Sequence, residues 1–444
     1  MTGSEILDLI KNAGVAGAGG AGFPAHVKLA AGAHKLIANC AECEPLLASD
    51  RFLMEQEAAR IVRGLKLAMK AAGASKGILG VKEKNHAAVS ALTEAVSGED
   101  DITVHLLENY YPAGDEVQLI YETTGKVVPA GALPASVGCI VQNAQTLAHI
   151  ADACEGLPVT ARNVTVAGAV RQPCTLKAAI GTSVSELIDA AGGADCESPR
   201  VIIGGPLMGR VAADADSEYV TKTTGGIVVL PEDHPLIRKK CSDLGLQYRI
   251  ARSACCQCSY CTMICPRGQL GLGVQPNRIM QALTMQDAAL LLNADAVMAC
   301  CGCGLCTYVG CTMGLAPDRF MTAMRSELLK RKVKTDRLPS PVNAMREFSK
   351  VPTGRLMRRT GILRYDTRPV FVRDINEPRK VRIMLKQHIG EACAPLVRAG
   401  DRVVKGTRIG EPPEGALGAA VHASVSGTVK TVTEDYIDIV SGSL

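Results

Sequence analysis

Two stretches of sequence decide what kind of protein this chain is: CCQCSYCTMICP at residues 255–266 and CCGCGLCTYVGC at residues 300–311. In the first, four cysteines follow the spacing C-x2-C-x2-C-x3-C, and a proline comes directly after the last one. The second repeats the three closely spaced cysteines, but its fourth cysteine comes one residue later and no proline follows. This spacing is typical of thiolates that hold [4Fe–4S] clusters, so the sequence predicts two clusters in a mostly helical segment.

The fourth cysteine of each run is expected to cross over. In two-cluster ferredoxins it binds the cluster of the other run, which brings the two clusters close together. The extra residue before Cys311, for which Gly310 is the natural place, changes the local geometry without removing the ligand.

Zinc is the alternative metal for these cysteines. A zinc site uses four ligands, usually as two separated pairs, and two C-x2-C-x2-C triplets supply more cysteines than that. Cys256 and Cys301 are rejected as ligands because either would break the spacing. The predicted ligand sets are Cys255, Cys258, Cys261 and Cys311 for one cluster, and Cys300, Cys303, Cys306 and Cys265 for the other.

The composition of the chain excludes several function classes. A length of 444 residues is too great for one compact core and predicts three or four domains. Aromatic residues make up only 3% and tryptophan is absent, which argues against a protein built on base or sugar stacking. The formal charge is only +5, and the basic stretch 325–364 is interpreted as a helix end and linker. We therefore expect no nucleic-acid partner.

The distribution of cysteines and the first residues of the chain indicate the cellular compartment of the protein. Many of the eighteen cysteines cluster between residues 255 and 311. The chain opens without a basic, apolar leader, and no apolar run is long enough to span a bilayer. We therefore expect a cytoplasmic protein without a transmembrane segment, in which clustered cysteines indicate metal or redox chemistry rather than disulfides.

The order of apolar runs predicts several domains of different class. Ser4 is expected to cap a first helix, and short β-type runs then alternate with helical runs, which is typical of an α/β domain. Short strands separated by glycine turns indicate an all-β domain at the other end of the chain. The predicted fold is a multidomain α/β and α+β protein: an α/β domain at 1–160, an α+β module of β-grasp type at 161–238, a helical ferredoxin-like two-cluster domain at 239–336, a basic linker at 337–370 and an all-β domain at 371–444.

A glycine-rich segment near the N-terminus admits two interpretations. Gly17-x-Gly19-x-x-Gly22 has the letters of a dinucleotide fingerprint, but it follows a short helix and leads into Phe23-Pro24, which is not the context of a Rossmann motif. Such a loop can still present backbone N–H groups to a phosphate, with Lys28 adding a positive charge. The acidic run at 39–45 would suit ribose hydroxyls or ring N–H groups. The alternative is a tight turn followed by a solvated acidic loop.

Together these segments resemble a known family of redox proteins. GAGGAGFP at 17–24 and NCAECEP at 39–45 resemble the flavin- and NADH-binding subunit of respiratory complex I, and still more closely the RnfC component of the Rnf complex. YYPAGDE at 110–116 and VQNAQT at 141–146 match two further segments of that site. Relatives in complex I carry an acid where this chain has Ala41, so the resemblance favours Glu42 as the carboxylate on the flavin side.

The resemblance implies a full set of cofactor-binding residues and no catalytic side chain, because the cofactors carry the redox steps. The residues expected around FMN are Gly17, Gly19, Gly20, Gly22, Lys28, Asn39, Glu42, Tyr111, Gly114, Asn143 and Thr146. The residues expected around the nicotinamide nucleotide are Phe23, Glu44 and Glu116.

Two further segments extend the resemblance over nearly the whole chain. The segment from Asn163 to about residue 200 resembles the soluble-ligand-binding β-grasp (SLBB) domain of the same proteins. Residues 387–429 resemble the barrel-sandwich domain of RnfC, which there precedes the flavin domain and here comes last. This order, with one flavin domain and two clusters, resembles the cobalamin reductases of bacterial propanediol-utilization microcompartments.

The resemblance implies an NADH-dependent reductase that passes electrons through FMN and two [4Fe–4S] clusters to cobalamin, from Co(III) through Co(II) to Co(I). None of the eight histidines has an aspartate two places before it, so the Asp-x-His-x-x-Gly pattern of cobalamin cofactor proteins is absent. Cobalamin is thus expected as a visiting substrate or as cargo for a partner adenosyltransferase.

The sequence alone leaves open where in the cell the protein lies and which molecule accepts its electrons. A microcompartment location would add shell proteins as partners, and residues 4–12 would then be either an address to the shell or, as we favour, the first helix of the flavin domain. The alternative function is an Rnf-type conduit between NADH and ferredoxin or a membrane complex. A scaffold with a decayed flavin site is a further alternative.

Overall fold

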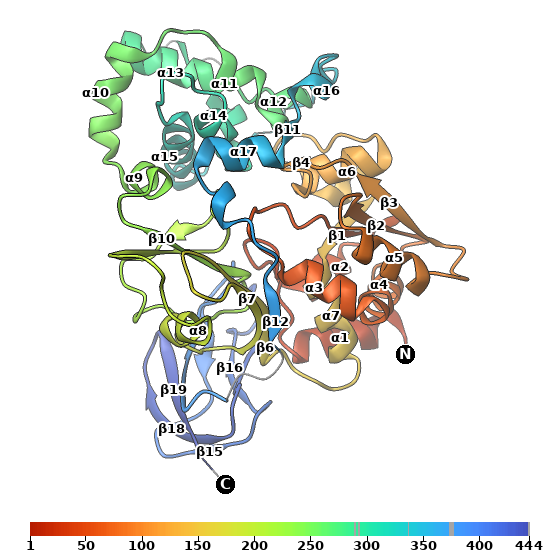
Figure 1. The fold of residues 1–444 in the computed structure, drawn as a ribbon. Helices are drawn as coiled ribbons and strands as arrows, with labels where there is room; N and C mark the ends of the chain where they lie inside the picture. Colours follow the sequence, from red (N-terminus) through yellow and green to blue (C-terminus); the bar gives the residue numbers. More distant parts are fainter. Residues whose placement is uncertain (288–289, 292–293, 336, 373–376, 443–444) are drawn as a thin grey trace.

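The computed structural model describes residues 1–287, 290–291, 294–335, 337–372 and 377–442. The N-terminal domain is built on a parallel sheet in the order β3-β2-β1-β5 (Figure 1). From β1 the chain moves outwards to β3 and then returns to the other side of β1. In open parallel sheets, ligands bind outside the carboxyl ends of the strands at such a reversal. The strands are β1 (Lys35–Cys40), β2 (Lys76–Lys82), β3 (Ile102–Leu107) and β5 (Cys139–Asn143).

Helices cover both faces of this sheet, and their ends are capped locally. Thr2, and not Ser4 as predicted, caps the first helix, because Thr2 and Glu5 form a reciprocal capping box. Helices α4 and α7 pack so closely that a Cβ on Gly64 would lie 1.9 Å from the carbonyl oxygen of Leu147. The elements around the sheet are α1 (Gly3–Asn12), α2 (Ala25–Ala30), α3 (Ser49–Gln56), α4 (Ala58–Ala72), α5 (His86–Ala95), β4 (Tyr110–Tyr111), α6 (Glu116–Thr124), η1 (Pro134–Val137) and α7 (Ala144–Ala153).

The next module is a mixed sheet with one helix. Its order is β12-β7-β6-β10-β8-β9, so the edge strand comes from far along the chain. Valines and isoleucines of the sheet pack against the buried side of the helix to form a separate core. The elements are β6 (Ala161–Gly168), β7 (Cys174–Ala179), α8 (Val184–Ala190), β8 (Pro199–Ile203), β9 (Arg210–Val211), β10 (Gly226–Pro231) and the edge strand β12 (Val370–Val372).

The cysteine-rich segment is helical, as predicted, and lies at the top of Figure 1. Several of its helices are a single turn long, and each of these contains or directly follows a cysteine of the two runs. The elements are α9 (Pro235–Cys241), α10 (Leu244–Ala254), α11 (Tyr260–Met263), α12 (Pro266–Gln269), α13 (Pro276–Met285), η3 (Ala294–Ala299), α14 (Leu305–Tyr308) and α15 (Pro317–Lys330).

The segment expected as a basic linker follows the surfaces of two domains. Its short strand β11 pairs with β4 of the N-terminal domain, and β12 joins the mixed sheet beside β7. Arg346 is buried and donates to Gln118 and Glu122 of α6. This segment therefore connects the flavin, cysteine-rich and β-grasp parts. Its elements are α16 (Arg346–Ser349), β11 (Val351–Pro352), α17 (Thr353–Thr360) and η4 (Leu363–Tyr365).

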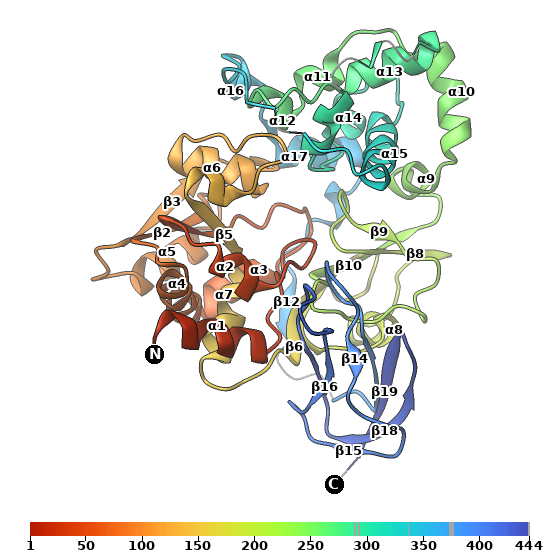
Figure 2. The ribbon, with the colours of Figure 1, turned by 180° about the vertical axis from the view of Figure 1, so that it is seen from behind.

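The C-terminal domain is all-β, with two small sheets in the orders β13-β19-β18-β15 and β14-β16-β17. It lies against the β-grasp module and near the N-terminal helices (Figure 2). Lys222 joins the three domains: its buried ammonium donates to the carbonyl oxygens of Gly14, at 2.6 Å, and of Ala420. The strands are β13 (Lys380–Met384), β14 (Ala394–Pro395), β15 (Arg402–Val403), β16 (Arg408–Glu411), β17 (Val421–His422), β18 (Gly427–Val432) and β19 (Tyr436–Ser441).

Among the residues that the structure describes, we find no helix that is both long enough and apolar enough to cross a bilayer.

Candidate functional site

The predicted cluster ligands surround two separate small cavities. Within the described ranges, no three His, Cys, Asp or Glu side chains converge on a point that could hold a single metal ion. We call the two spaces the outer and the inner cavity. The outer cavity is lined by Cys255, Cys258, Cys261 and Cys311, among others, and the inner cavity by Cys265, Cys300, Cys303 and Cys306, among others.

Each cavity thus gathers three cysteines of one run and the fourth cysteine of the other run. The extra residue before Cys311 is accommodated because Gly310 lies tightly against the first run: a Cβ there would be 2.8 Å from Ile264 and 3.0 Å from the Cα of Cys261. Four thiols around a space of this kind match the donor set of a cubane cluster. Cys256 and Cys301 also line the outer and inner cavities, respectively, so spacing and not location separates them from the predicted ligands.

The two cavities differ in exposure and electrostatics. In the outer cavity, Cys258 is exposed, whereas three of the four cysteines of the inner cavity are buried. Burial, followed by neighbouring thiols, raises the pKa of Cys261 to about 12. Burial likewise raises the pKa of Cys300 to about 11. Four thiolates at either place therefore need the positive charge of bound iron.

Backbone and side-chain N–H groups reach the thiols of both cavities. In the outer cavity, Leu315 N donates to Cys311 Sγ at 3.3 Å and Gln257 Nε2 to Cys255 Sγ at 3.5 Å. In the inner cavity, Gly302 N donates to Cys300 Sγ at 3.4 Å. Such hydrogen bonds are one of the factors that set cluster potentials.

The inner cavity is held directly by the flavin domain. Asp115, at the start of α6, forms an ion pair with Arg267 at 2.6 and 2.7 Å, and Arg267 lines the cavity. Gln118 Nε2 donates to the carbonyl oxygen of Pro266 at 2.8 Å. The hydroxyl of buried Tyr111 lies 3.1 Å from the carbonyl oxygen of Cys303.

Asp115, Gln118 and Arg267 were not predicted as site residues. Asp115 lies inside the 110–116 segment that matched the family, and Arg267 directly follows Cys265-Pro266, so both were close to recognised motifs. Their pairing was not visible, because it joins positions 152 residues apart in the chain.

The glycine loop lies over the carboxyl end of β5 and the first turn of α7. Ala18 N donates to Thr146 Oγ1 at 2.9 Å, and a Cβ on Gly19 would lie 3.0 Å from the side chain of Asn143. Gly20 is exposed, and a Cβ there would meet nothing within 4 Å. The loop is therefore anchored at its start and open at its middle, next to the N-terminus of a ten-residue helix, an arrangement suited to a phosphate.

Predicted residues from three other segments meet beside the carboxyl end of β1. Lys28 Nζ forms a 2.6 Å ion pair with Glu116, so the flavin-side lysine and the nucleotide-side acid are in contact. Asn39 Nδ2 donates to the carbonyl oxygen of Gly114 at 2.8 Å. Phe23 is half-buried at the end of the glycine loop. The structure thus brings the segments of the expected flavin and nucleotide site together.

The two predicted acids of the 39–45 run bond within the protein. Glu42 accepts from the backbone N–H groups of Asp50, at 2.8 Å, and Arg51, at 3.0 Å, at the start of α3. Burial and the nearby Asp50 raise the pKa of Glu42 to about 7. Glu44 accepts from the Tyr111 hydroxyl at 2.9 Å and from Leu207 N of the β-grasp module at 2.8 Å. Burial raises the pKa of Glu44.

A third hollow, open to solvent, lies between α3, β7 and β12. Arg51 and Arg368 line it together with the stacked rings of Phe52 and Phe371. None of the predicted site residues is among its lining residues.

Comparison with protein families identifies four segments of the chain. Residues 10–152 match the Nuo51 FMN-binding domain, 163–211 the SLBB domain, 254–316 a 4Fe-4S dicluster domain and 363–443 the RnfC barrel sandwich hybrid domain. These matches confirm the predicted fold class and the predicted FMN and [4Fe–4S] cofactors.

Curated proteins match over the same chain. Cobalamin reductase PduS of Salmonella typhimurium is 42% identical over 446 residues, which cover 100% of this chain and 98% of that protein. Cobalamin reductase PduS of Citrobacter freundii is 41% identical, with 98% of this chain and 96% of that protein covered. The C component of the Na(+)-translocating ferredoxin:NAD(+) oxidoreductase complex of Acetobacterium woodii is 39% identical, with 60% of this chain and 58% of that protein covered.

Proposed function

The chain belongs to the family of the cobalamin reductases named PduS, and from this premise we propose that it reduces the cobalt of cobalamin with electrons from NADH. The contacts of Asp115, Gln118 and Tyr111 with the inner cavity are the observation that carries the proposal. Bound FMN would supply a two-electron acceptor for the hydride of NADH, and two bound [4Fe–4S] clusters would supply single-electron carriers. The chain's own residues position these groups and set their surroundings.

For the cofactors we propose the residues predicted from the sequence. The anchored glycine loop and the first turn of α7 support a role in holding the phosphate of FMN. The contacts of Lys28, Asn39 and Gly114 support their place beside the ring and the nucleotide. Glu42 is proposed to act through α3, because its carboxylate is already occupied by backbone N–H groups. The eight cysteines are proposed as ligands in the two sets that line the outer and inner cavities.

The contacts of the cysteine-rich segment support a direction for electron transfer. Asp115, Gln118 and Tyr111 all hold the inner cavity, so electrons would enter there. The outer cavity carries an exposed cysteine, and Met313 on its rim is 49% exposed. We propose that electrons leave towards cobalamin at this exposed rim.

Cobalamin is proposed as a visiting substrate, since the histidine pattern of proteins with resident cobalamin is absent from the sequence. We further propose a cobalamin adenosyltransferase as the partner that uses the reduced cobalt, together with shell proteins and a place inside a bacterial microcompartment. The Rnf-type alternative has less support, because the match to the Acetobacterium woodii protein covers only 60% of this chain.

The test is to purify the protein without oxygen and record visible spectra after NADH alone, and then after NADH with hydroxocobalamin. Bleaching of flavin and iron–sulfur absorption followed by the spectra of Co(II) and trapped Co(I) is the expected result. Bleaching without corrinoid reduction would move the acceptor to ferredoxin or another partner. No bleaching by NADH would contradict the assignment of the N-terminal domain.

A further inference from the structure

Lys82 is a buried lysine that forms no ion pair with any residue that the structure describes. It is the last residue of β2, its exposed fraction is 0%, and its buried ammonium has no hydrogen-bond partner within the part of the chain that the structure describes. A buried, unpaired ammonium costs several kcal/mol, and proteins avoid this cost unless a partner supplies the opposite charge. A bound group that carries negative charge would be such a partner.

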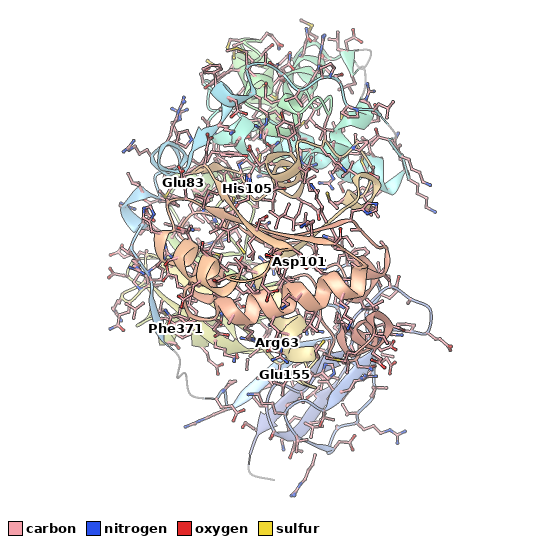
Figure 3. All side chains as sticks on the ribbon, turned by 90° about the vertical axis from the view of Figure 1, so that its right-hand side faces the viewer. Arg63, Glu83, Asp101, His105, Glu155 and Phe371 are labelled. Carbon is pink, nitrogen blue, oxygen red and sulfur yellow. The ribbon has the colours of Figure 1, made fainter. Side chains whose placement is uncertain are left out.

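The position of Lys82 points to the flavin site. β2 and β5 flank β1, so the carboxyl ends of all three strands lie along one edge of the sheet. Figure 3 labels Glu83, the next residue, on the side of this domain that faces the cysteine-rich segment, whereas Arg63 and Glu155 lie together on the opposite side. The cofactor segments described above meet at the edge where Lys82 ends its strand.

The immediate neighbours of Lys82 belong to these segments. The ammonium lies near the thiol of Cys43, whose Sγ accepts from Gly114 N at 2.7 Å. Gly114 in turn accepts from Asn39. Cys43 therefore links Lys82 to Gly114 and Asn39, two residues that are expected to contact FMN.

The neighbours do not supply the missing negative charge. Burial raises the pKa of Cys43, and the Lys82 ammonium offsets only part of that rise, so Cys43 remains a neutral thiol. A second lysine nearby adds to the imbalance: Lys84 has a pKa lowered by burial and then by the charge of Lys82. Glu44 acts on Cys43 and Asp366 on Lys84, but neither carboxylate forms an ion pair with Lys82 among the described residues.

The distance between strands indicates whether the phosphate or the ring of the flavin would lie near Lys82. The glycine loop and the N-terminus of α7, which suit a phosphate, lie at the end of β5. Two strand intervals of about 4.8 Å separate β5 from β2, so a phosphate at β5 would be about 10 Å from Lys82. The group near Lys82 would then be the ring and not the phosphate.

We propose that the ammonium of Lys82 is the counter-charge for the flavin ring and stabilises its reduced form. Hydride transfer from NADH brings two electrons and one proton to the ring, and NAD⁺ leaves; without a second proton the reduced ring carries one negative charge. A cation held nearby stabilises this charge and raises the flavin potential. This role rests on the proposed function, and it makes Lys82 a positioning and tuning residue that the sequence patterns did not reveal.

The test compares Lys82→Met and Lys82→Gln with Lys76→Met, a control at the exposed lysine that begins the same strand, at the end away from Lys82. We expect affinity for oxidised FMN to stay within a few-fold of the unsubstituted protein. Affinity for reduced FMN should fall tenfold or more in both Lys82 variants, which lowers the two-electron midpoint potential by about 30 mV or more. Potentials are measured by dye equilibration on purified, flavin-loaded protein, without cobalamin.

Stability of the flavin-free protein gives a second readout. Lys82→Met should leave its thermal midpoint unchanged or raise it, because the substitution removes an unpaired buried charge. An unchanged flavin potential in both variants, or a flavin-free Lys82→Met protein that is clearly less stable with an unshifted potential, overturns the role of Lys82. A wild-type protein that holds no flavin would instead overturn the proposed function itself.

Discussion

The outer and inner cavities are built from the same ligand pattern but lie in different surroundings. The inner cavity is mostly buried and is held by an ion pair and hydrogen bonds from the flavin domain. The outer cavity has an exposed cysteine and an exposed methionine at its rim. Cysteine spacing predicts two equivalent sites, whereas their surroundings distinguish an entry from an exit. Four tests of this difference follow, in order of decreasing expected effect.

The strongest test removes one ligand from each cavity. Cys303→Ala should abolish NADH-driven reduction of both the outer cluster and cobalamin, because the inner cluster is the entry. Cys258→Ala should abolish cobalamin reduction but leave the inner cluster reducible by NADH. Anaerobic visible and EPR spectra after NADH addition measure both effects. Equal loss in both variants would contradict the assigned direction.

The second-largest effect is expected from breaking the ion pair between Asp115 and Arg267 at the inner cavity. Asp115→Asn should destabilise the protein by about 3 kcal/mol, because it leaves Arg267 as an unpaired and nearly buried charge. Denaturant unfolding measures the loss, and stopped-flow bleaching should show slower reduction of the clusters than of the flavin. Glu327→Gln, which breaks the exposed pair with Arg331, is the control and should cost about 0.5 kcal/mol or less.

A smaller effect is expected from the hydroxyl between the flavin domain and the inner cavity. Tyr111→Phe should cost about 1–3 kcal/mol, because it leaves the half-buried Glu44 without one of its donors. Electron entry into the clusters should also slow. Tyr110→Phe is a matched control, since Tyr110 donates to Glu122 instead. If both variants reduce the clusters at the same rate, the contact between Tyr111 and Cys303 has no part in electron entry.

The smallest expected effect concerns the exposed rim of the outer cavity. Met313→Glu should lower the rate of cobalamin reduction by a few-fold, because it places a hydrated charge where the substrate approaches. NADH-driven bleaching should not change. Leu133→Glu, at a 69% exposed residue outside the cysteine-rich segment, is the control. A Met313 variant that reduces cobalamin at the normal rate would move the exit to another surface.

Sequence patterns predicted more about the cysteine-rich segment than about the flavin site. Cysteine spacing alone led to the two ligand sets, and the structure lines one cavity with each, although their role as ligands stays a prediction. The flavin residues were predicted from a resemblance. Single glycines, acids and amides do not indicate a binding site in the sequence, because they form one only when the fold brings them together. The first helix shows the limit of local reasoning. Ser4 is a residue type that often caps helices, but Thr2 caps this helix because it forms a reciprocal pair of hydrogen bonds with Glu5. The predicted domain boundaries also stay a prediction.

The sequence by itself determined the ligand pattern, the classes of domain and the kind of cofactor, because thiolate spacing and the period of apolar residues act over short stretches of chain. Only the tertiary structure decided which cavity touches the flavin domain, that Asp115 pairs with Arg267, and that Lys82 is buried without a partner among the described residues. These features depend on burial and on contacts between residues far apart in the chain. Burial and distance set the strength of a charge, and no local pattern encodes either of them.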